Sequence, residues 1–116
     1  MMCETLIGKI VQQKLLAETK YPNFADSFFS RVTKADENSI EAIKTRLNYC
    51  RSLSDSEKPH YSVEATLQEE VLEVMEAAAE NRWEDCMTEL AQVGSVVLRA
   101  MEWVQNNKLN KEPKNA

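Results

Sequence analysis

The residues that could carry out chemistry in this chain are concentrated in one acidic stretch, residues 67–93. Glu70 and Glu73 are three residues apart, so on a helix their side chains share one face. A second stripe follows at spacings of four and three residues, formed by Asp85, Glu89 and Gln92. Carboxylate and amide oxygens are ligands that hard divalent cations accept. The two stripes therefore suggest a cation site between two helices.

The charge of this stretch is far more negative than that of the whole chain. Between Glu64 and Glu89 nine acidic residues accompany one base, Arg82, which gives a local charge of −8, whereas the chain as a whole carries −5. Like charges at helical spacing repel one another unless a cation neutralises them. A solvated acidic helix face is the alternative reading. Oxygen ligands without histidine favour Mg²⁺ or Mn²⁺ over zinc.

Apolar residues at helical spacing predict the elements that position these acids. Four helices are expected, over residues 5–18, 40–50, 62–80 and 83–104. Ser62 is predicted to cap the third helix, and Asn81 with Arg82 forms the turn before the fourth. A further short helix is expected after Asn23, with three core phenylalanines and a valine: Phe24, Phe28, Phe29 and Val32.

The remaining segments are predicted to connect these helices. Residues 33–39 are expected to form a polar turn in which Asp36 or Ser39 caps the next helix. Residues 52–61 are expected to form a linker that contains His60, the one histidine. Residues 106–116 are expected to form a flexible tail.

Length and composition fit a single all-α domain over residues 1–105. The 116 residues include 43% hydrophobic residues, two glycines and three prolines. The acidic balance argues against a nucleic-acid polymer as partner. Three widely spaced cysteines do not suggest a disulfide framework, so reduced thiols and a cytoplasmic location are expected. No segment approaches 18 consecutive apolar residues, so no membrane span is expected.

Two motifs in the acidic stretch resemble those of a known family. Glu69, Glu70 and Glu73 spell EExxE, and Glu89 to Gln92 spell ExxQ on the second helix. This resembles the MazG-like nucleotide pyrophosphohydrolases of the all-α NTP pyrophosphatase superfamily, whose pattern is EExxE followed by ExxD. The resemblance covers about residues 62–104. Gln92 stands where the family has aspartate.

The resemblance implies a four- to five-helix MazG-like bundle with an antiparallel acidic hairpin. It implies Mg²⁺-dependent, or Mn²⁺-dependent, hydrolysis of a (d)NTP to (d)NMP and pyrophosphate, as in nucleotide-pool house-cleaning. By position Glu70, Glu73 and Glu89 match metal ligands, and Glu69 matches a glutamate that assists a metal-bound water or a further ion. A glutamine oxygen at Gln92 can also bind a hard cation but brings no charge. Asp85, one turn before Glu89, is a possible substitute ligand.

Three hypotheses remain open at this point. The first is the pyrophosphohydrolase, and the second is a degenerate relative that binds a nucleotide or a protein without hydrolysis. The third is a structural helical oligomer with a solvated acidic face. A homo-oligomer, dimer or tetramer, is expected because the long helices carry apolar residues on more than one face. Phosphate-binding candidates outside the acidic stretch are Lys14, Lys20, Arg31, Lys34, Arg46 and Arg51.

Overall fold

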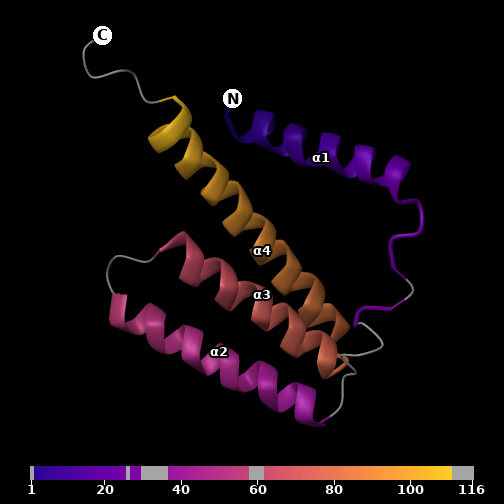
Figure 1. The fold of residues 1–116 in the computed structure, drawn as a ribbon, viewed down its shortest axis with the longest axis vertical. Helices are drawn as coiled ribbons and strands as arrows, with labels where there is room; N and C mark the ends of the chain where they lie inside the picture. Colours follow the sequence, from indigo (N-terminus) through magenta and orange to yellow (C-terminus); the bar gives the residue numbers. More distant parts are fainter. Residues whose placement is uncertain (1, 26, 30–36, 58–61, 111–116) are drawn as a thin grey trace. The chain divides into compact units, whose positions relative to one another are not determined.

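The computed structural model describes residues 2–25, 27–29, 37–57 and 62–110. These residues contain only helices (Figure 1): α1 (Met2–Lys20), α2 (Glu37–Glu57), α3 (Val63–Ala79), α4 (Trp83–Val104) and the short π-helix η1 (Gln105–Leu109). The predicted all-α class is confirmed. Within the described ranges, no helix combines the length and the apolar character that a membrane crossing requires.

The chain divides into two compact units. One spans residues 27–96 and contains α2, α3 and the first part of α4; the other combines α1 with the chain from Val97 onward. The predicted acidic cluster lies entirely in the first unit. The prediction of a single domain over residues 1–105 stays a prediction.

Helix α3 begins and ends with recognisable capping interactions. The Ser62 hydroxyl accepts a hydrogen bond from the Ala65 backbone N–H at 3.1 Å, so the predicted N-cap is confirmed. At the other end Asn81 adopts a left-handed backbone with φ 57°. Its N–H donates to Ala78 O at 3.1 Å, and the Arg82 N–H donates to Ala77 O at 2.8 Å. This is a Schellman motif, and it stops the helix so that the chain can reverse into α4.

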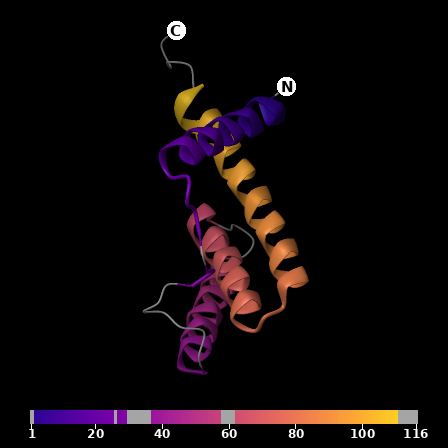
Figure 2. The ribbon, with the colours of Figure 1, turned by 90° about the vertical axis from the view of Figure 1, so that its right-hand side faces the viewer.

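Helices α3 and α4 pack through small residues near this turn. Val74, Ala77, Ala78 and Cys86 form a buried cluster, against which Phe29 and Val93 pack. The Cys86 thiol lies 3.9 Å from the Val74 carbonyl oxygen, which it faces as a weak donor. Alanines allow close approach of the two helices. Figure 2, the view turned by 90°, shows the chain reversing its direction between α3 and α4.

Helix α2 packs against α3 along its length. It buries Ile43, Leu47 and Cys50, which recur at helical spacing. Ion pairs join Lys44 to Glu80 and Arg51 to Glu73, each at 3.3 Å. Because the lower-numbered residue of α2 pairs with the higher-numbered residue of α3, the two helices run antiparallel.

Three local predictions are wrong in the described residues. Residues 23–25 have irregular backbone and residues 27–29 form a bend instead of a helix, and Phe24 is 94% exposed. Residues 52–57, predicted as linker, continue α2, which buries Ser54. Gln105–Leu109, most of which was assigned to the tail, forms η1.

One further prediction, a cap by Ser39, is wrong, and four others concern residues that the structure does not describe. Ser39 lies inside α2, which begins at Glu37, so Ser39 does not cap it. The predictions for Val32, Asp36, His60 and residues 111–116 lie outside the described residues.

In the second unit, α1 extends beyond the predicted residues 5–18 at both ends. Leu6 is buried, whereas five other apolar residues of α1 are exposed: Ile7, Ile10, Val11, Leu15 and Leu16. Lys14 pairs with Glu18 at 2.8 Å, one turn away on the same helix.

Candidate functional site

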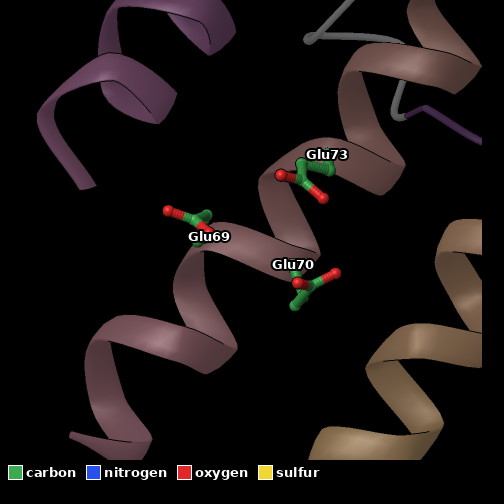
Figure 3. Close-up of side chains that lie close together, drawn as sticks. All are labelled: Glu69, Glu70 and Glu73. Atoms are coloured by element: carbon green, nitrogen blue, oxygen red, sulfur yellow. The ribbon is translucent and has the colours of Figure 1, made fainter. Parts of the chain in front are cut away.

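Three carboxylates of α3 form the centre of the candidate site. One oxygen each of Glu69, Glu70 and Glu73 lies within 4.8 Å of the others, and all three residues are half-buried. Figure 3 shows them projecting from neighbouring turns of the one helix. The spacing EExxE brings them together because residues one, three and four apart on a helix are adjacent in space. These three acids, with Glu89 and Gln92, are called the acidic cluster below.

Helix α4 contributes the other two residues. Glu89 lies beside Glu73, which helps to raise the pKa of the Glu89 carboxyl group. The Gln92 amide faces Glu70 and Glu89. With its nitrogen turned toward them, Gln92 donates to Glu70 Oε2 at 3.1 Å and to Glu89 Oε2 at 3.0 Å. With its oxygen turned toward them, the amide faces acceptors, an arrangement that either a cation or a protonated carboxyl group would satisfy.

Residue pairs across this interface follow an antiparallel order. Gln92 meets Glu70, Glu89 meets Glu73, and Cys86 meets Val74. Increasing numbers on α4 thus accompany decreasing numbers on α3. The acidic hairpin that the sequence predicted is antiparallel in this unit.

Two carboxyl groups of the acidic cluster, those of Glu70 and Glu89, have raised pKa values. Burial, followed by repulsion from Glu73, Glu89 and Glu69, raises the pKa of Glu70 to about 7. Burial and the contact with Glu73 also raise the pKa of Glu89, with Arg82 acting in the opposite direction. Both shifts have the sign expected for acids that repel one another in a partly desolvated position. A bound cation would relieve this repulsion.

Asp85, the possible substitute ligand, points to a different partner. Its Oδ2 accepts from Arg82 Nη1 at 2.8 Å, and its side chain is 63% exposed. Arg82 also binds Glu80 through Nε at 3.1 Å and Nη2 at 2.9 Å. These pairs lower the pKa of Glu80, mainly through Arg82 and then Lys44. Asp85 therefore belongs to the ion pairs that Arg82 forms with Glu80 and Asp85 at the α3–α4 turn, here called the Arg82 clasp. It lies outside the carboxylate triad of α3.

Of the basic candidates, Arg51 contacts the acidic cluster, through its pair with Glu73. Arg46 donates to Gln68 at 3.2 Å and lies over the Tyr49 ring. Lys14 pairs with Glu18, and Lys20 lies over the Tyr21 ring. Arg31 and Lys34 are outside the described residues.

Two features of the site have no counterpart in the sequence reasoning. The Arg82 clasp was missed, although the Arg82–Asp85 spacing of three on a helix could have indicated it. The selection of Arg51 among the basic candidates depends on how α2 packs against α3, which no local pattern encodes. Trp83, exposed by about half, contacts the Phe28 ring at 5.9 Å between centroids, in agreement with a packing role.

The arrangement as a whole is an acidic cluster on a helical hairpin, with donor sets suited to a hard divalent cation. Comparison with protein families, with curated proteins and with solved structures gives no match.

Proposed function

We propose that this protein is a divalent-cation-dependent nucleotide pyrophosphohydrolase of the MazG-like type, which converts a (d)NTP to (d)NMP and pyrophosphate. The observation that carries the proposal is the convergence of Glu69, Glu70 and Glu73 within 4.8 Å, with Glu89 of the second helix close to Glu73. A helical face with three mutually repelling acids, partly removed from water, is costly unless a cation is held there.

The donor set fits Mg²⁺ or Mn²⁺. Glu70, Glu73 and Glu89 are the residues that would hold the ion, and Gln92 adds an oxygen when its amide is turned toward them. The ion supplies charge neutralisation for the phosphates and a more acidic water. Asp85, paired with Arg82, is left out of this ligand set.

In the proposed reaction, water attacks a phosphorus atom and the bond to the pyrophosphate oxygen breaks. Glu69 is assigned to orient that water and accept its proton, because it occupies the position of the glutamate that has this role in the family it resembles. Glu70 and Glu73 lie on successive turns of α3, which fixes the spacing of the positions from which their carboxylates project. Fixed carboxylates of this kind contribute by positioning and by electrostatic stabilisation.

A second function is favoured by one specific observation. The Gln92 amide nitrogen can donate to Glu70 and Glu89 and so occupy the position of a cation. This supports a protein that binds a nucleotide or a protein partner at the cluster without hydrolysing it.

One experiment separates the two. The purified protein is incubated with each NTP and dNTP in Mg²⁺ or Mn²⁺, and pyrophosphate release is measured. We expect release, its loss in Glu73→Gln, and its retention in Glu84→Gln, which removes an exposed acid of the same hairpin outside the cluster. Absence of release from every nucleotide would refute the hydrolase, and calorimetric nucleotide binding in that case would support the second function.

A further inference from the structure

Arg51 of α2 forms an ion pair with Glu73 of the acidic cluster. Its Nη2 lies 3.3 Å from Glu73 Oε1, and the exposed fractions of the two side chains are 49% and 21%. Glu73 also lies close to Glu70 on the same helix and to Glu89 on α4, and its charge helps to raise the pKa of both. One guanidinium from α2 thus competes for the residue that joins the two acidic stripes.

This ion pair is of the kind that breaks easily. Pairs with such exposed partners contribute little to stability, because water screens them and the side chains lose freedom. A divalent cation held by the cluster would compete for the same carboxylate. Arg51 would then carry an unpaired planar fork of donors, which matches the oxygens of a phosphate group.

We propose that Arg51 is a phosphate-binding residue that is paired with Glu73 in the cation-free protein and transfers to a polyphosphate when a divalent cation takes Glu73. This inference rests on the proposed function and adds to it the residue that links cation binding to substrate binding. It predicts that removing the Arg51 guanidinium changes the affinities for the cation and for a polyphosphate in opposite directions. Without the Arg51 guanidinium the cluster binds a cation more tightly, whereas the cation-loaded protein binds a polyphosphate more weakly.

The neighbouring bases of α2 do not meet the same conditions. Lys44 pairs with Glu80, which Arg82 also binds at the α3–α4 turn. Arg46 donates to the neutral amide of Gln68 and contacts no acid of the cluster in the described residues. Arg46→Gln is therefore a matched control, because it removes an arginine from the same helix and the same interface.

The test uses calorimetry on the full chain with two probes. Mn²⁺ alone is titrated into wild type, Arg51→Gln and Arg46→Gln; inorganic pyrophosphate is then titrated at saturating Mn²⁺. For Arg51→Gln we expect about two- to fivefold tighter Mn²⁺ binding, the range set by a weak exposed pair. We expect at least about tenfold weaker pyrophosphate binding, since hydrogen bonds to charged groups are lost. Arg46→Gln should change neither by as much as twofold.

The signs of the two changes decide the outcome. If Arg51→Gln weakens both ligands, Arg51 merely positions Glu73, and the proposed transfer is overturned. Unchanged affinities, or a wild type that binds no Mn²⁺, overturn it as well. Arg51→Lys retains the charge and serves if the glutamine variant does not fold; weakened pyrophosphate binding with near-native Mn²⁺ binding supports the proposal. Opposite signs in a protein that releases no pyrophosphate from nucleotides would uphold this inference while the hydrolase proposal fails.

Discussion

Gln92 adds no charge to the acidic cluster, but its amide can offer either a donor or an acceptor to the carboxylates around it. As a donor it binds Glu70 and Glu89 and lessens their repulsion. As an acceptor it supplies an oxygen to a cation but no charge. If the acidic cluster binds a cation as proposed, we therefore expect Gln92 to stabilise the cation-free hairpin and to lower its affinity for the cation relative to an aspartate.

Replacing Gln92 by aspartate should separate these two effects. Gln92→Asp adds a carboxylate beside Glu70 and Glu89, so we expect Mg²⁺ to bind about tenfold more tightly. In metal-free buffer the added repulsion should lower the free energy of unfolding by about 1 kcal/mol, and saturating Mg²⁺ should reverse the sign. Denaturant unfolding with and without Mg²⁺ measures both quantities.

Ser95→Asp is the control for this change, because it adds the same charge at an exposed position one turn further along α4. It should leave Mg²⁺ affinity within twofold of wild type. If Gln92→Asp behaves like Ser95→Asp, position 92 does not take part in the site.

At the scale of elements, the α3–α4 turn determines which acids meet. Helix α3 ends at Ala79, and the left-handed Asn81 two residues later sets the start of α4 at Trp83. A shift of one residue at this point would rotate α4 by about 100° relative to α3. Glu89 and Gln92 would then no longer face Glu73 and Glu70.

Substitutions at Asn81 test this role of the turn. Asn81→Ala should lower the free energy of unfolding by about 1 kcal/mol, because alanine disfavours positive φ, while Asn81→Gly should be neutral or slightly stabilising. Urea unfolding provides the measurement. The same chemical change within a helix, Asn48→Ala on α2, should stabilise slightly, since alanine is the better helix former. Equal losses for both alanine variants would contradict the argument.

The elements and the acidic cluster differ in how far the sequence could predict them. Ser62, Asn81 and the apolar spacing act locally, so the bounds of α3 and α4 and the turn between them followed from the sequence. The helix at Phe24 failed because local spacing cannot show whether a core is available to bury it. Residues 52–57 continue α2 because the helix buries Ser54 and Cys50 against its neighbours, a tertiary effect that overrides weak local preference.

Predicting which side chains meet within the cluster was possible only in part. Helical spacing alone places Glu69, Glu70 and Glu73 together. Their approach to Glu89 and Gln92 needs the antiparallel register, and the partners of Asp85 and Arg51 need the packing of the turn and of α2. The sequence therefore indicated which acids form the cluster, but not that Arg51 pairs with Glu73 or that Arg82 pairs with Asp85.

At the scale of the whole molecule, each compact unit leaves large apolar side chains in contact with solvent. In α1 the exposed fractions of Ile7 and Leu15 are 43% and 58%, and in the unit of residues 27–96 that of Met87 is 70%. Burying such residues is worth about 1.5–3 kcal/mol each. We therefore expect the chain to associate with further copies of itself, as a dimer or a tetramer.

Light scattering at micromolar concentration should give a mass that is a multiple of the 13.3 kDa chain. Ile7→Lys places a charge within the apolar stripe of α1 and should weaken self-association about tenfold or more if this helix lies in the interface, because the charge would have to be desolvated. Gln12→Lys adds the same charge at an exposed polar position of α1 and should have a smaller effect. Met87→Lys applies the same test to α4. A wild-type mass of one chain at these concentrations would show that the exposed apolar residues serve some purpose other than self-association.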